Sequence, residues 1–181
     1  LRLVGSEMCI RDRAYPVTLW DIHGQSGHPL RTTLSEMGPL LLGNLLELND
    51  SQQAALYAAF KVADREGLLL LDIKDLKALL GHLKDHPEVL GEDSALMTSG
   101  STQALLRRLA TLEQQGAEAL FGEPALQLED LLHPGADGRG RIHLLDASRL
   151  VHESPKVYAT FLLWMLAELF EQLPERGDAD K

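Results

Sequence analysis

The stretch that decides the fold is residues 140–174, GRIHLLDASRLVHESPKVYATFLLWMLAELFEQLP. It reads as a strand, a short crossover and an apolar helix. Arg141 to Ala147 carries large aliphatic residues with little polar alternation, which predicts a strand covered on both faces. From Val157 to Leu173 apolar residues would occupy almost the whole circumference of a helix, which predicts a helix buried on most sides. A strand feeding such a helix predicts an α/β fold in which a further parallel strand follows.

Local signals mark the ends of this helix. Ser154 is expected to accept a hydrogen bond from the first free N–H groups, and Pro155 occupies a position where no donor is needed. Pro174 is expected to end the helix. Because charged residues soon interrupt the apolar run, it is too short to span a bilayer, and no membrane partner is expected. The main core is predicted to include Leu144, Phe161, Trp164, Met165 and Leu169.

The earlier part of the chain begins with strands and continues with helices. Pro16 to Ile22, PVTLWDI, is rich in β-branched and aromatic residues and predicts a strand. Asn49 with Gln52 predicts a capping box, and Gly67 a helix end. We therefore expect residues 14–34 to supply strands, residues 35–134 a helical insertion, and residues 135–181 the last strand and helix of the same sheet. Asp72 is expected to cap another helix.

Composition indicates one ordinary globular domain of 181 residues, 45% of them hydrophobic. The formal net charge is −10. Nucleic-acid contacts are made mostly by Lys and Arg, so this acidic balance argues against a DNA-binding surface within the stretch.

Residues 1–13 are set apart from the rest. Leu3 to Asp12, LVGSEMCIRD, resembles what one reading frame of a common transposase-type sequencing adapter encodes. We expect residues 1–13 to be such an artefact, packing poorly; the alternative is a natural N-terminal strand. Without them the chain loses Cys9, its only cysteine, which fits a cytoplasmic protein without disulfides. These residues carry a net charge of +1, so residues 14–181 carry −11.

Glycine clusters give no phosphate site. A phosphate loop needs G-x-x-x-x-G-K-[ST], so that backbone N–H groups and a Lys surround the phosphates, and that pattern is absent from this sequence. Gly38 to Asn44 has two suitably spaced glycines but no Lys or hydroxyl, and its apolar interior predicts a buried helix. The cluster of Gly135, Gly138 and Gly140 precedes a strand and is predicted to form a turn.

Histidines and acids suggest two small polar sites, each with a simpler interpretation. His82 and His86 stand four apart and could face one metal, but the nearby Pro87 favours a solvated helix end. Asp21, His23 and His28 flank the first turn and could form a site at the carboxyl end of a strand. The alternative, which turn chemistry favours, is that they satisfy the backbone of the turn.

Four arginines could act in trans on a neighbouring subunit, although solvated surface charge is the default interpretation. They are Arg107, Arg108, Arg139 and Arg141. No Ser/His/Asp or Cys/His set emerges from the spacing. The residues themselves therefore assign no catalytic, cofactor-binding or metal-binding position.

Five ordered blocks resemble a known family. They are PVTLWDIHGQSGHPLRTTLSEMGPLLLGNLLELND (16–50), EGLLLLDIKDLKALL (66–80), LEQQGAEALFGEP (112–124), DGRGRIHLLDASRL (137–150) and YATFLLWMLAELFEQLPERGD (158–178). Together they resemble the bacterial HerA-like ATPases of the YjgR type. Such proteins are P-loop NTPases related to DNA-translocating motors, with a RecA-like parallel sheet.

The resemblance implies that this chain is an internal part of such an enzyme. The phosphate loop would lie upstream of Pro16, and an acidic metal-binding strand would follow Lys181. ATP and Mg²⁺ are then cofactors of the parent protein, which would be a hexameric ring and could act on DNA. This stretch alone is expected to be inactive. The alternative is a non-enzymatic helical protein-interaction module, because the visible residues carry no distinctive chemistry.

Overall fold

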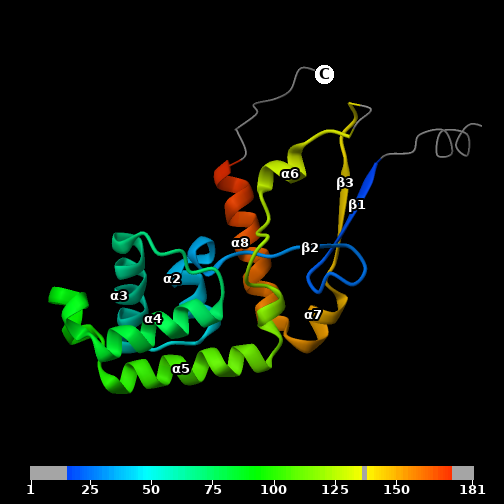
Figure 1. The fold of residues 1–181 in the computed structure, drawn as a ribbon. Helices are drawn as coiled ribbons and strands as arrows, with labels where there is room; N and C mark the ends of the chain where they lie inside the picture. The colour runs from blue at the N-terminus through cyan, green and yellow to red at the C-terminus, as the bar shows by residue number, and fades with distance from the viewer. Residues whose placement is uncertain (1–15, 136–137, 173–181) are drawn as a thin grey trace, which may run out of the picture.

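A small parallel sheet anchors the structure. The computed structural model describes residues 16–135 and 138–172. Its strands are β1 (Val17–Asp21), β2 (His28–Pro29) and β3 (Ile142–Asp146), in the order β2-β1-β3. Both pairings are parallel, and Val17 lies opposite Ile142. The α/β class is therefore confirmed, with most of the described chain helical (Figure 1).

A block of helices separates the first two strands from the third. Figure 1 shows the four longer helices of this block on one side of the last helix, with the sheet on the other side. In chain order the elements of the block are α2 (Leu34–Leu45), α3 (Asp50–Glu66), α4 (Ile73–Asp85), η1 (Pro87–Leu96), α5 (Ser99–Gln114), η2 (Ala117–Ala119) and α6 (Leu128–Leu132).

Side-chain caps fix where these helices begin and end. Asn49 and Asp72 each accept a hydrogen bond from the N–H three residues on, and the side chain of that residue accepts from the N–H of the cap. Gly67 ends α3 in the left-handed conformation with φ of 66°. These three predictions are confirmed. Thr33 and Glu36 form a further capping box at α2 that was not anticipated.

The chain after β3 forms α7 (Ser148–Glu153) and α8 (Pro155–Gln172), so the predicted start at Pro155 is confirmed. The predicted cap is wrong, because no N–H of α8 donates to Ser154 Oγ in the described part of the chain; the hydroxyl instead donates to the carbonyl oxygen of Gln115 at 2.6 Å. That carbonyl lies just after α5, where helix carbonyls lack intrahelical partners. Ser154 therefore joins α8 to α5. The predicted stop at Pro174 and the expectations for residues 1–13 lie outside the described residues.

One continuous hydrophobic cluster runs through the helical block and α8. Phe161 and Trp164 are buried in it, as predicted, while Met165 and Leu169 are partly buried against it. Leu144 was predicted to belong to the core, and this is wrong because its side chain is 51% exposed. Among the described helices, none has the length and apolarity needed to cross a membrane.

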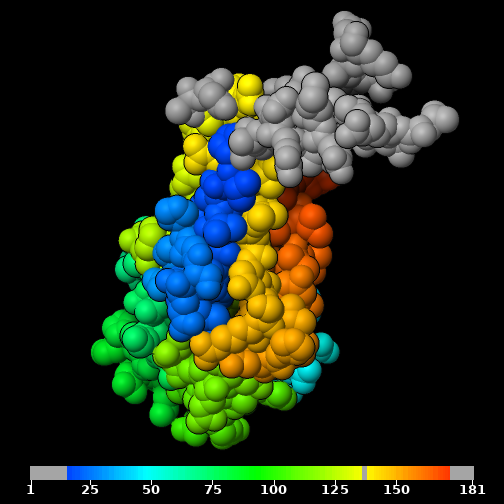
Figure 2. All heavy atoms as spheres, turned by 90° about the vertical axis from the view of Figure 1, so that its right-hand side faces the viewer, coloured from blue at the N-terminus to red at the C-terminus, as the bar shows by residue number. Residues whose placement is uncertain are grey.

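One face of the sheet is bare. We call Val17, Leu19, Ile142 and Leu144 the bare face; each is about half exposed. In Figure 2, β1 and β3 lie side by side at the surface. The prediction of a strand covered on both faces is therefore wrong, because the core packs only against the face that carries Trp20 and Leu145.

The last helix is also less covered than its composition predicted. Its outer side exposes Leu163, Leu166 and Phe170, the last by 89%. Among the described elements, α2, α6 and α7 make the most extensive contacts with α8. Because these contacts cover only part of its circumference, the prediction of burial on most sides is wrong.

Replacing Gly27 with alanine is expected to destabilise the protein by roughly 1–3 kcal/mol, because overpacking forces the backbone to move. A Cβ at Gly27 would lie 2.5 Å from the carbonyl oxygen of Leu19, which is backbone and cannot swing away. The matched control is Gly81→Ala inside α4, where a Cβ meets nothing within 4 Å. That change is expected to stabilise by up to about 1 kcal/mol. Urea denaturation measures both, and equal effects would contradict the expectation.

Candidate site at the carboxyl end of the sheet

Two aspartates end neighbouring parallel strands at the same edge of the sheet. Asp21 is the last residue of β1 and lies opposite Asp146, the last residue of β3. Ligands of open parallel sheets bind outside the carboxyl ends of the strands. A cavity of about 70 Å³ lies here, lined by both aspartates and by His23, Ser26 and Arg149 among others. Its position makes this cavity the first candidate for a functional site.

Asp21 holds the turn that follows β1. Its carboxylate is buried and accepts backbone N–H groups from His23 at 2.9 Å, Gln25 at 2.7 Å and Ser26 at 2.9 Å. Burial is the largest single influence on the pKa of Asp21 and raises it, but the three hydrogen bonds together outweigh burial and lower the pKa. Asp21 is thus an ionised structural acceptor, which supports the interpretation that it satisfies the turn backbone.

Asp146 is held by the first turn of α7. Its Oδ1 accepts the backbone N–H of Ser148 at 3.0 Å and also the Ser148 hydroxyl. The Ser148 hydroxyl, followed by its N–H, lowers the pKa of Asp146, while the nearby charge of Asp21 opposes this. The residue is exposed to solvent. Arg149 next to it pairs with Glu153 at 2.9 Å.

The three residues proposed from the first turn are only partly brought together. His23 lines the cavity with Asp21, and its Nε2 is buried without a hydrogen-bond partner in the described part of the chain. His28 instead packs against Trp20, with ring centroids 5.9 Å apart, in a different pocket. Sequence reasoning missed Asp146. The signal was present in part, because each of the two predicted strands has an aspartate one residue before its predicted end, and parallel strands end at the same edge of a sheet.

This edge alone does not supply phosphate chemistry. Transfer of a phosphoryl group needs a cradle of N–H groups and a Lys. No lysine lines the cavity, and its two carboxylates repel polyanions. Within residues 16–135 and 138–172, no group of three or more His, Cys, Asp or Glu side chains could hold a metal ion.

The other histidine pair lies at the exposed end of α4. The rings of His82 and His86 are 4.6 Å apart, and His86 Nδ1 lies 3.0 Å from Glu88 Oε1. The residues of α4 end at Asp85. His82 and His86 therefore lie at an exposed helix end, which supports the simpler interpretation of this pair.

The two glycine clusters are structural. Gly38 to Asn44 lies within α2, where Gly38 takes a φ of 72° and kinks the helix ahead of Pro39. Gly138 donates its N–H to the carbonyl of Gly135, and Gly135 donates to the carbonyl of Arg139, each at 2.8 Å. The predictions of a helix and a turn are confirmed, but the helix is only partly buried, since Leu42 is fully buried and Leu40 is 60% exposed.

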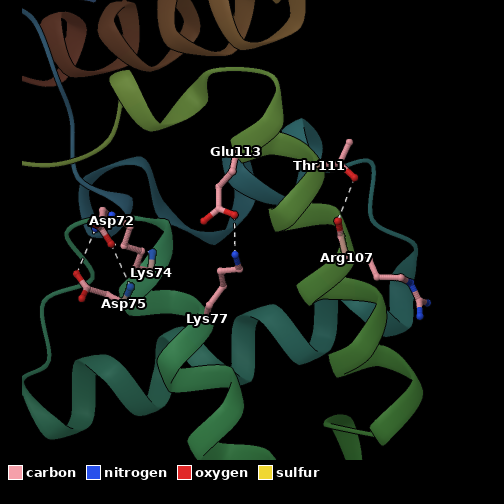
Figure 3. A network of polar contacts seen from close by, with 7 residues as sticks. All are labelled: Asp72, Lys74, Asp75, Lys77, Arg107, Thr111 and Glu113. Carbon is pink, nitrogen blue, oxygen red and sulfur yellow. Dashed lines mark hydrogen bonds and ion pairs between the residues drawn. The ribbon is translucent and has the colours of Figure 1, made fainter.

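The arginines of α5 do not belong to the lining of the cavity at the sheet edge. Arg108 Nη1 is 3.9 Å from Glu47 Oε2, and Glu47 also binds Lys156 of α8 at 2.6 Å. In Figure 3 the guanidinium of Arg107 points away from the ion pair of Lys77 with Glu113, which joins α4 to α5 at 2.6 Å. A role in trans for these arginines, or for Arg139 and Arg141, remains a prediction.

Acidification is expected to weaken the turn after β1. The folded pKa of Asp21 is lowered, so its stabilisation is present above the unfolded value of about 3.9 and is lost as pH falls through the folded pKa. Asp21→Asn should cost about 1–2 kcal/mol at pH 7, because one N–H loses its acceptor, and should remove this acid dependence. Unfolding by urea at pH 7 and below pH 4 tests it. Asp146→Asn, at an exposed position, is the control and should cost less; an equal loss would contradict the assignment.

Comparison with known proteins gives one match. A family model described as "Helicase HerA-like C-terminal" matches residues 5–181. No curated protein matches the chain. No solved structure matches it either.

Proposed function

Because the chain belongs to the helicase HerA-like C-terminal family, we propose that it is part of a bacterial NTP-driven motor of the YjgR type. The observation that carries this proposal is the family match, which extends over nearly all of the chain. The parallel pairing of β1 with β3 supports it, because an NTPase of this kind is built on a parallel sheet.

In this proposal the chain supplies scaffold and the rest of the motor supplies the nucleotide contacts. The phosphate loop precedes Pro16, the acidic strand that binds Mg²⁺ follows Lys181, and ATP with Mg²⁺ is the cofactor of the whole protein. The carboxyl ends of neighbouring strands converge at one edge of the sheet, where Asp21 and Asp146 lie. Loops entering from both sides would complete the site at that edge.

The 181-residue chain is expected to show no binding of Mg-ATP in calorimetric titration, since it has no G-x-x-x-x-G-K-[ST] sequence. A longer polypeptide extended on both sides is expected to bind in the micromolar range, about −8 kcal/mol. The matched control replaces the Lys of the upstream phosphate loop with Ala and should lose binding. Micromolar binding by the 181-residue chain, or none by the longer one, would contradict the proposal.

The assembly and the substrate are proposed for the whole protein. We infer a ring of identical subunits acting on DNA, with the DNA contacts outside this acidic stretch. Light scattering of the longer polypeptide tests the ring. A salt titration of DNA binding by the longer polypeptide tests the action on DNA, because contacts to phosphates give a steep dependence on salt.

A second candidate function is a protein-interaction module without catalysis. The bare face of the sheet and the exposed Leu163, Leu166 and Phe170 of α8 favour it, because large exposed apolar patches mark interaction sites. Sequencing through both ends of the gene separates the two candidates. An open frame containing a phosphate loop upstream supports the motor.

A further inference from the structure

A pocket with a mixed apolar and polar lining lies on the covered face of the sheet, opposite the bare face. It has a volume of about 400 Å³ and is lined by residues of β1, β2, β3 and the segment from Pro124 to His133. Pockets for small molecules start at roughly 300 Å³. Neither the family assignment nor the proposed motor function accounts for this pocket, and a ligand bound there would be independent of both.

One side chain of this pocket carries a buried donor with no partner. Trp20 Nε1 donates to His143 Nδ1 at 2.8 Å. Nδ1 is therefore the acceptor, and the proton of the neutral ring is on Nε2. His143 Nε2 is buried and has no hydrogen-bond partner among the described residues. A buried unsatisfied donor is uncommon and destabilises a folded protein, so it calls for an acceptor atom.

Two more donors lie beside His143. The parallel register places Thr18 opposite His143, and Arg141, the residue before β3, lies two positions before His143 and lines the same pocket. Arg141 Nη1 is 3.4 Å from Thr18 Oγ1, so the guanidinium donates to the hydroxyl oxygen and the hydroxyl proton remains available. Arg141, Thr18 and His143 all belong to the lining of the pocket, so a guanidinium, a hydroxyl and an imidazole lie together there.

This set of donors matches a carboxylate. An ionised carboxylate only accepts hydrogen bonds, has about four lone-pair sites on two oxygens, and forms strong charge-assisted bonds with Arg. The rest of the lining includes the Trp20 ring, Pro29 and Leu126, which suit an apolar body. Asp130 in the lining and the net charge of −10 disfavour a dianion such as a phosphate.

The geometry points to a binding site for small monocarboxylates with a flat or branched apolar body. The carboxylate meets Arg141, Thr18 and His143, and the apolar body lies against Trp20, Pro29 and Leu126. This site is separate from the cavity at the carboxyl end of the sheet, which is lined by Asp21 and Asp146.

The test uses benzoate as the probe and the indole N–H signals of the 181-residue chain in two-dimensional NMR. The chain has two tryptophans, so a Trp164→Phe variant assigns the Trp20 signal. Benzoate is expected to shift the Trp20 signal saturably. Benzamide keeps the ring but not the charge, and phenyl phosphate carries a dianion; each should bind at least about tenfold more weakly. No saturable shift with benzoate up to about 10 mM would overturn the proposal.

Two variants localise the carboxylate. Arg141 is exposed, so Arg141→Gln should keep the fold, which circular dichroism checks. The variant should bind benzoate at least about tenfold more weakly. Arg107→Gln, an exposed arginine on α5, is the matched control and should leave binding unchanged. His143→Phe removes the Nε2 donor and should also bind benzoate more weakly than the unchanged chain. Benzoate binding that is unchanged in Arg141→Gln, or equal binding of benzamide, would overturn the assignment.

Discussion

Trp164→Ala is expected to lower the free energy of unfolding by roughly 3–5 kcal/mol, the range for emptying a large aromatic site in a core. Trp164 is 3% exposed, and its ring centroid lies 5.8 Å from that of Phe161, which is fully buried. Both side chains belong to the hydrophobic cluster that joins α8 to the helical block. Urea denaturation followed by circular dichroism measures the loss.

Two further variants show whether lost burial is the cause. Trp164 Nε1 is buried without a partner in the described part of the chain, so Trp164→Phe keeps most of the ring and removes an unpaired donor. It should cost less than half as much as the change to alanine. Phe170→Ala, at a side chain that is 89% exposed, should cost less than about 0.5 kcal/mol. A similar loss in all three variants would show that burial does not determine the effect.

Leu109→Ala is expected to cost about 2–5 kcal/mol, the second large effect. Leu109 is fully buried on α5, which packs against both α3 and α4. Its control is Leu69→Ala, where the side chain is 73% exposed and the change should cost less than about 0.5 kcal/mol. Equal costs at the two positions would contradict the packing of α5.

The two core variants also test whether the described chain unfolds as one unit. The hydrophobic cluster is continuous from α2 through α5 to α8, so each variant should move a single transition. Circular dichroism and tryptophan fluorescence should therefore report the same midpoint. If Leu109→Ala produced an early transition without a change in fluorescence, the helical block would be an independent unit.

Sequence reasoning succeeded where a structure depends on neighbours in the chain. Asn49 and Asp72 cap helices through residues three positions away, and Gly67 ends a helix through its own backbone freedom. Apolar spacing likewise located β3 and α8 to within a few residues. Trp164 was placed in the core correctly because it lies on the side of α8 that meets the helical block.

Sequence reasoning failed where the answer depends on which elements are present to pack. Leu144 is as apolar as a core residue, but an apolar pattern does not reveal that no described helix covers its face of the sheet. Ser154 was misassigned because its partner, Gln115, lies 39 positions away. The bond between Trp20 and His143 spans 123 positions, so no local spacing could have revealed the pocket that it helps to form.

That long span also sets an order of events during synthesis. At roughly 5–20 residues per second, Trp20 leaves the ribosome on the order of 10 s before His143, because the two are 123 positions apart. In that interval Val17 and Leu19 have no partner residues on another strand, while α2 to α5 can already make contacts close in sequence, before α8 completes their shared core. The sheet therefore closes only after α2 to α5 have been made, and the change in the surroundings of the Trp20 indole marks the moment when β3 joins β1.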